Sequence, residues 1–143
     1  MSLFGKKSSL APLLQAAKDG KAQDVRAQIQ QGADVNMVDA EKGMTALMFA
    51  AENGKVDAVK ALLEAKANAN LATKKGTTAL MYAALAGNME IVQALLSAGA
   101  DSKIKDVNGQ TALVLAREKA KAQGMYADEK LCKVRDFLAT LPN

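Results

Sequence analysis

Apolar and polar positions alternate along this chain in a pattern longer than a single helix or strand. The segments MTALMFAAENGK, TTALMYAALAGN and QTALVLAREKAK share most of their apolar positions, and their threonines, Thr45, Thr78 and Thr111, recur every 33 residues. Self-similarity at a fixed period of this length is typical of repeat proteins. We therefore interpret the chain as a series of repeats, each of which forms one structural unit.

A second apolar segment follows each of these phrases. VDAVKALLEAKANAN begins at Val56, and its residues Val59, Leu62 and Leu63 have the i, i+3, i+4 spacing of one helix face. MEIVQALLSAGADSK, which begins at Met89, repeats that spacing. An earlier copy at 11–36 (APLLQAAKDGKAQDVRAQIQQGADVN) brings the number of repeats to four. Each repeat is thus predicted to contain two short helices.

These repeats predict a single domain, in line with the chain length of 143 residues. The domain is expected to cover residues 10–141, with repeats at about 10–42, 43–75, 76–108 and 109–141, after a flexible lead of residues 1–9. The threonines are predicted helix N-caps, since a hydroxyl can accept a hydrogen bond from a free backbone N–H. Paired alanines such as Ala50–Ala51 and Ala83–Ala84 let neighbouring helices approach closely, so that the repeats stack.

The repeated phrases resemble the ankyrin repeat, with its Gly-x-Thr-Pro-Leu-His-x-Ala-Ala opening and its Gly-Ala-Asp-Val-Asn ending. Residues 32–36 match that ending letter for letter, and Gly99-Ala100-Asp101 repeats its start. The resemblance implies an all-α fold, an ankyrin solenoid of four helix–turn–helix repeats joined by β-hairpin-like loops. The alanine-rich wording is similar to that of short ankyrin proteins of bacteria.

The chain departs from the family pattern at several positions, among them the motif Pro, which becomes Ala46, Ala79 and Ala112. Where the motif has His, this sequence has Leu14, Met48, Met81 and Val114, and the chain contains no His at all. The hydrogen bonds made by that ring must therefore be absent, and we expect apolar packing to replace them. Lys66 takes the place of the glycine after the second helix of repeat 2, which predicts either a strained left-handed lysine or a different turn.

The fourth copy holds about nine additional residues within REKAKAQGMYADEK. One interpretation is a polar cap that closes the array, because terminal repeats are usually atypical. The polar side chains that would form this cap are Arg117, Glu118, Lys119, Lys121, Lys130 and Lys133. The alternative is a specific contact made by Met125 and Tyr126 at the tip of the insertion.

Composition argues against catalysis and gives no sign of export. Without His, a Ser–His or Cys–His arrangement and a His-based zinc site are excluded, and the single cysteine, Cys132, is expected to be a buried residue of the last helix. We expect no enzyme activity, no metal and no cofactor, and assign no catalytic role to the Asp39/Glu41 or Asp128/Glu129 pairs. No membrane segment is visible, so the expected compartment is the cytoplasm, or the periplasm if a signal has been removed.

The resemblance implies that hairpin tips and the exposed face of each first helix bind another protein. Mapped onto the variable motif positions, the predicted partner contacts are Met44, Phe49, Glu52, Asn53, Lys74, Lys75, Thr77, Tyr82, Leu85, Val107, Asn108, Gln110 and Glu118. Aromatic residues often anchor interfaces. For Phe49 an interface role and a packing role are equally open, whereas the Tyr82 hydroxyl favours the interface.

The sequence predicts a non-enzymatic protein-binding module, monomeric on its own, that docks a partner protein in its concave groove. An inhibitor or immunity protein of a partner enzyme is preferred over an adaptor, because an adaptor usually needs two binding surfaces. The other alternative is weak nucleic-acid binding through Lys74, Lys75, Lys103 and Lys105. A net charge of +4 with interspersed acids does not favour it.

Overall fold

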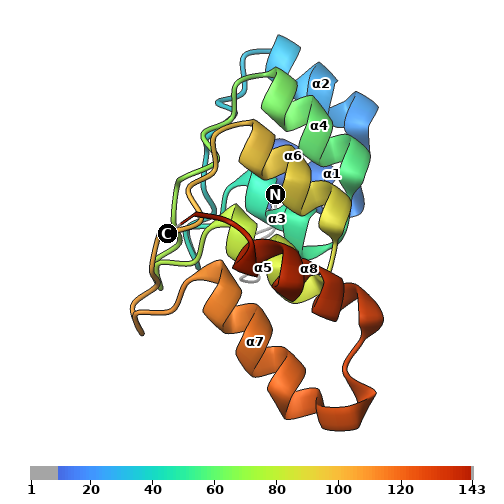
Figure 1. Cartoon of the computed structure of the whole chain (residues 1–143). Coiled ribbons are helices and arrows are strands. Elements are labelled where there is room, and N and C mark those ends of the chain that lie inside the picture. Colours follow the sequence, from blue (N-terminus) through green and yellow to red (C-terminus); the bar gives the residue numbers. More distant parts are fainter. Residues whose placement is uncertain (1–9, 143) are drawn as a thin grey trace, which may run out of the picture.

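The computed structural model describes residues 10–142 (Figure 1). This part of the chain forms eight α-helices and one short 3-10 helix, and no extended strand. The helices are α1 (Pro12–Asp19), α2 (Ala22–Gln30), α3 (Ala46–Glu52), α4 (Val56–Glu64), α5 (Ala79–Ala86), α6 (Met89–Ser97), α7 (Ala112–Gln123) and α8 (Glu129–Ala139), with η1 (Gly124–Tyr126) between the last two. The predicted flexible lead of residues 1–9 lies outside the described residues.

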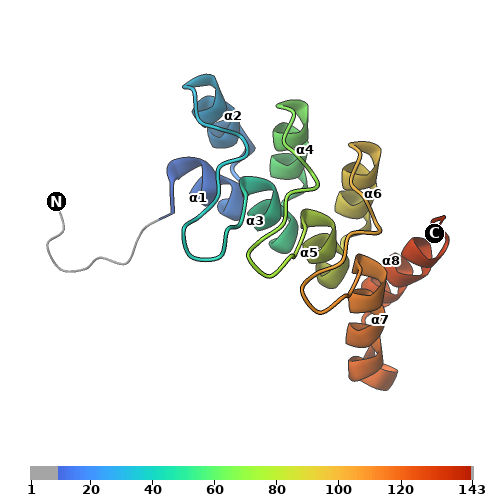
Figure 2. The ribbon, with the colours of Figure 1, turned by 90° about the vertical axis from the view of Figure 1, so that its left-hand side faces the viewer.

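The helices stack as four antiparallel pairs, which confirms the predicted solenoid. Helices α1, α3, α5 and α7 lie side by side in one layer, and α2, α4 and α6 form a second layer, which is above the first in Figure 2. The loops between pairs project to one side of the inner layer. Isolated antiparallel bridges, Val38 with Thr45 and Ala72 with Thr78, give two of these loops their hairpin form. Each pair falls within one predicted repeat, and the limits of the repeats stay a prediction.

Small side chains set the spacing of the inner layer. Ala50, Ala51, Ala83, Ala84 and Ala116 are all completely buried. Because alanine adds only a methyl group beyond the backbone, the helix axes can approach closely, and the larger leucines fill the space between the two layers. The predicted role of the paired alanines is thus confirmed by their burial.

The three threonines cap their helices as expected, and a methionine sulfur adds a bond that the sequence did not reveal. The Thr45 hydroxyl accepts a hydrogen bond from the Met48 backbone N–H at 3.2 Å, and the Met48 sulfur accepts one from the Thr45 N–H at 3.4 Å. Thr78 and Met81 repeat this exchange at 3.4 and 3.5 Å. The expectation that apolar packing alone replaces the missing histidine is therefore corrected, since the thioether is also a weak acceptor.

Hydrogen bonds also join one repeat to the next. The Asn36 side-chain oxygen accepts a bond from the Asn68 N–H at 2.8 Å, and the Asn70 oxygen accepts one from the Asp101 N–H at 2.7 Å. Between hairpins, the Lys74 N–H donates to the Lys42 carbonyl at 3.1 Å, and the Val107 N–H donates to the Lys75 carbonyl at 3.0 Å. These bonds fix the register of neighbouring loops.

The insertion in the fourth repeat lengthens α7 and adds η1. The end of α7 and η1 therefore project beyond the stack (Figure 1). Ala116 and Ala120 on α7 pack against the core, as do Leu131 and Val134 on α8. Cys132 lies on α8 as predicted but is only half-buried, because Leu131 on one side of it takes the buried position.

Lys66 adopts the left-handed conformation, with φ of 66°, and is the only non-glycine residue with positive φ among those described. The turn itself is unchanged. The Ala67 N–H donates to the Leu62 carbonyl at 3.0 Å, as the Ala100 N–H does to the Leu95 carbonyl at 2.9 Å after Gly99. Of the two sequence alternatives, the strained lysine is the one observed.

We expect Lys66→Gly to raise the free energy of unfolding by about 0.5–1 kcal/mol. Removing the Cβ relieves about 1–2 kcal/mol of left-handed strain, and the added freedom of glycine in the unfolded chain takes back part of it. Urea denaturation measures the change. Lys103→Gly is the matched control, because Lys103 has no positive φ, and it should lower stability. An equal loss of stability in both variants would contradict the presence of backbone strain at Lys66.

Candidate functional site

The predicted contact residues lie mainly on one surface, which we call the inner face. It consists of the hairpin loops at 38–45, 72–78 and 105–111 and the exposed sides of α3, α5 and α7. Each hairpin is held beside the next by the backbone hydrogen bonds described above. The inner face is therefore a continuous surface on a supported backbone, as a docking surface requires.

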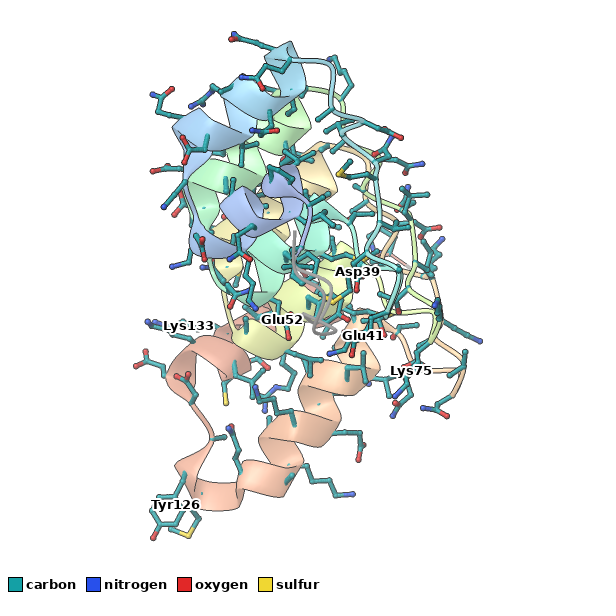
Figure 3. All side chains as sticks on the ribbon, turned by 180° about the vertical axis from the view of Figure 1, so that it is seen from behind. Asp39, Glu41, Glu52, Lys75, Tyr126 and Lys133 are labelled. Carbon is teal, nitrogen blue, oxygen red and sulfur yellow. The ribbon has the colours of Figure 1, made fainter. Side chains whose placement is uncertain are left out.

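The inner face is hollowed where repeats 1 and 2 meet. A hollow of ≈ 340 Å³ lies between the first hairpin and the ends of α1 and α3. Its acidic lining residues are Asp39, Glu41 and Glu52, which Figure 3 shows in one region of the molecule. Phe49 forms part of the apolar wall, together with Leu10. Lys18 and Lys42 also line it, so the hollow combines charges of both signs with an apolar surface.

Tyr82 lies next to this acidic region on α5 and is half-buried. Burial is the main reason why the pKa of its phenol is raised above the ordinary value of 10.0, and the charges of Glu52 and Asp39 raise it further. The neutral hydroxyl is therefore retained over the whole physiological range. It remains available as a hydrogen-bond donor or acceptor towards a partner.

Asp39 organises the first hairpin through its carboxylate. The Met44 N–H donates to it at 2.6 Å and the Lys42 N–H at 3.1 Å. Burial alone would raise the pKa of the carboxyl, but these backbone hydrogen bonds outweigh it, and the pKa falls below the ordinary value of 3.8. The charged form of Asp39 thus stabilises the loop that forms the rim of the hollow.

Two lysines of the inner face have intramolecular partners. The Lys74 ammonium donates to the carbonyl groups of Ala40 at 2.7 Å and Glu41 at 3.2 Å, on the preceding hairpin. The Lys119 ammonium donates to the Leu85 carbonyl at 2.6 Å, near the C-terminal end of α5. Both side chains therefore connect neighbouring repeats, and the helix end is a favourable place for a cation.

A family model described as "Ankyrin repeats (3 copies)" matches residues 13–106, and a second, overlapping match covers 59–123. These matches span most of the chain. The chain belongs to the ankyrin-repeat family. Ankyrin repeats are generally protein–protein interaction modules without enzymatic activity. A search of curated proteins gives no match.

Most of the predicted contact residues on the ankyrin-repeat inner face are accessible to solvent, and the exposed fraction of their side chains varies. The exposed ones are Glu52, Asn53, Lys74, Lys75, Val107, Asn108 and Glu118. The half-buried ones are Thr77, Tyr82, Leu85 and Gln110. Val107 is the most prominent apolar member, with 68% of its surface exposed at the third hairpin. Their roles in binding stay predictions.

The prediction that Met44 and Phe49 lie on the surface is corrected by their burial. Met44 is only 2% exposed, because its backbone N–H and carbonyl both bond to Asp39, which closes the hairpin and turns the side chain into the core. Phe49 is 8% exposed and belongs to the same core. Of the two roles left open for Phe49, packing is favoured, although its edge still lines the hollow.

Sequence reasoning missed Asp39 and Val38 as members of the inner face. Asp39 was considered only as half of a carboxylate pair, yet it lines the hollow and closes the hairpin. Its signal was the Asp-x-x-x-Gly spacing to Gly43, which a side-chain-closed turn favours. Val38 is 53% exposed on the same hairpin, and an apolar residue in a loop gives no comparable signal.

Neither a metal-binding cluster nor a membrane-spanning helix is found in the part of the chain that the structure describes. Residues 10–142 contain no cluster of three or more Cys, Asp or Glu side chains placed to hold an ion. The Asp128 carboxylate accepts from the Lys130 N–H at 3.0 Å, and Glu129 pairs with Lys133 at 2.7 Å. None of the helices in this range is long and apolar enough to span a bilayer.

We expect Asp39→Asn to lower the free energy of unfolding at neutral pH, and the difference from the unaltered chain to shrink in acid. The folded-state pKa of Asp39 is lowered, so its stabilisation is present above pH 3.8 and is lost as the pH falls through the folded-state pKa. Denaturation between pH 7 and pH 2 measures this. Glu41→Gln is the control, since Glu41 accepts none of the bonds that close the turn; a pH-independent difference for Asp39→Asn would contradict the assignment.

Proposed function

We propose that this ankyrin-repeat chain acts by binding one partner protein across its inner face, without chemistry of its own. The observation that carries the proposal is the continuous row of hairpins, locked together by Lys74 N–H to Lys42 and Val107 N–H to Lys75 hydrogen bonds. A surface held in this way loses little conformational entropy when a partner docks. Exposed side chains on it are therefore available for recognition rather than for folding.

Charge along the inner face supports an oriented complex. Asp39, Glu41 and Glu52 gather at the hollow, where Lys18 and Lys42 balance part of their charge, and Lys75 extends from the next hairpin (Figure 3). Such a fixed pattern of charges favours one orientation of a partner and disfavours the reverse. Tyr82 is half-buried, lies near Glu52 and Asp39, and keeps a neutral hydroxyl. It is the side chain best suited to act as an anchor.

An inhibitor of a partner enzyme is the preferred form of this function, and an adaptor is the alternative. The inner face is one contiguous surface, and occupying it with a single protein is enough to cover that protein's own site. An adaptor would need a second surface for a different protein. The outer helices carry exposed ion pairs, Arg26 with Glu64 at 3.5 Å and Lys60 with Glu90 at 3.1 Å, which are typical of a solvated face.

Nucleic-acid binding is less well supported. Of the four lysines considered for it, Lys74 directs its ammonium at two backbone carbonyls of the preceding hairpin. Lys103 and Lys105 are exposed, but Asp101 and Asp106 lie beside them in the same loop. A phosphate backbone requires several free cations that release counterions on binding.

The test uses the purified chain as bait in an extract of its native cells, beside the variant Glu52→Arg/Lys75→Glu. Both residues are exposed, so the variant should fold normally and lose its partner, with affinity reduced at least tenfold. The matched control is Gln93→Arg/Ser97→Glu, which places the same two side chains on exposed positions of α6. Circular dichroism and thermal melting check the fold of each chain.

Capture of one protein by the unaltered chain and the control, and its loss from the variant, supports the proposal. If that protein is an enzyme, titrating its activity with the chain separates the inhibitor from the adaptor. Equal loss from the control and the variant would show that the inner face is not the binding surface. Recovery of nucleic acid alone, released by high salt, would replace the proposal with the alternative.

A further inference from the structure

The tip of the fourth repeat, residues 124–126, presents two large apolar side chains directly to solvent. Met125 is 97% exposed and Tyr126 is 90% exposed, the highest values among the large hydrophobic residues described. Figure 3 shows Tyr126 at the far end of the projection, away from the hairpin that carries Lys75. Full exposure of two adjacent residues of this kind suggests a contact with another molecule.

The extension that carries this tip adds little to the core, where Ala127 alone among residues 121–130 packs at the edge. None of the residues from Lys121 to Lys130 is buried, and the last buried position before the tip is Ala120. A polar cap would cover the end of the stack, whereas this segment points away from it (Figure 1). The extension is therefore explained by the exposed side chains at its tip and not by burial of the end of the stack.

The tip is also held in one conformation. The Ala127 N–H donates to the Gly124 carbonyl at 3.2 Å, and the Asp128 N–H donates to the Gln123 side-chain oxygen at 3.3 Å. Below the tip, α8 packs closely on the turn after α5, where a Cβ on Gly87 would lie 3.1 Å from the Leu131 nitrogen. Met125 and Tyr126 are thus presented on a supported loop, which lowers the entropy lost on binding.

Charge beside the tip indicates the chemistry of the surface it fits. The two acids that follow it have internal partners, since Asp128 caps α8 and Glu129 pairs with Lys133. Lys121 and Lys130 form no ion pair with any of the described residues. An apolar socket with an acidic rim therefore matches the tip. A lipid surface fits less well, because two apolar side chains bury too little area for stable insertion.

The tip is continuous with the inner face through α7. Glu118 on α7 belongs to the inner face, and the rest of α7 to Gln123 adds about 7.5 Å of helix rise before Met125 follows in η1. A protein that lies across α3, α5 and α7 therefore reaches the tip without a second docking event. One extended interface accounts for both surfaces.

We propose that Tyr126 and Met125 form a second anchor, which inserts into an apolar, acid-rimmed socket on the same protein that the inner face binds. The inference rests on the proposed function. Tyrosine and methionine are enriched among interface residues, and an anchor at the edge of a complex chiefly slows dissociation.

The test places the photo-crosslinking residue p-benzoylphenylalanine at position 126, at position 52 of the inner face, or at position 93 of the outer helix α6, in the full chain inside its native cells. We expect positions 126 and 52 to give adducts with one and the same protein, and position 93 to give none. The peptide joined to position 126 should contain apolar residues beside Asp or Glu.

The protein identified in this way is then purified and its affinity for the chain is measured. Met125→Ser/Tyr126→Ser should weaken binding at least tenfold through faster dissociation, whereas Tyr126→Phe should keep most of the affinity. The matched control, Gln30→Ser/Gln31→Ser at the end of α2, should bind normally. All these residues are exposed or half-buried, and an unchanged melting temperature confirms the fold of each variant.

An adduct at position 52 with none at 126, or with lipid or a different protein at 126, would overturn the second anchor and leave the proposed function standing. Unchanged affinity of the tip variant would do the same. Absence of any adduct at position 52 would contradict the proposed function itself, and this inference with it.

Discussion

Close approach of the inner helices is the constraint on which the rest of this structure depends. A two-helix repeat cannot bury its own apolar face, so each pair must use its neighbour as the missing half of a core. Completely buried alanines at positions 50, 51, 83, 84 and 116 bring the helices near enough for this to work. The same spacing brings successive hairpins within hydrogen-bonding distance and so creates the inner face.

The backbone of the inner face is thus fixed by stacking, which leaves its side chains free to vary. Lys74 and Lys119 show the limit of that freedom, because each ammonium bonds to a carbonyl of the preceding repeat. Residues such as Glu52, Lys75 and Val107 have no comparable role and can serve recognition. Stability and specificity therefore depend on different side chains of the same loops.

Periodicity predicted the helix pairs and the threonine caps, and it gave a left-handed Lys66 as one of two alternatives, because each follows from local backbone geometry. Local pattern could not separate exposed from buried residues within the hairpins. Met44 occupies a variable motif position, but the bonds to Asp39 turn its side chain inward. Phe49 and Tyr82 share one register and differ in burial, which depends on neighbours from other repeats. The sulfur bonds of Met48 and Met81 were invisible because they need a particular side-chain conformation.

The asparagine ladder determines how such an array can change in length. Asn36 and Asn70 each supply the side-chain oxygen for the following repeat, while the equivalent residue of the next repeat is Lys103, which has no acceptor. A unit duplicated between Asn36 and Asn70 would carry both the donor and the acceptor of its junction. In gene duplication, the unit between Asn36 and Asn70 can therefore be repeated with this bond intact, whereas the segment containing Lys103 cannot pass the bond on.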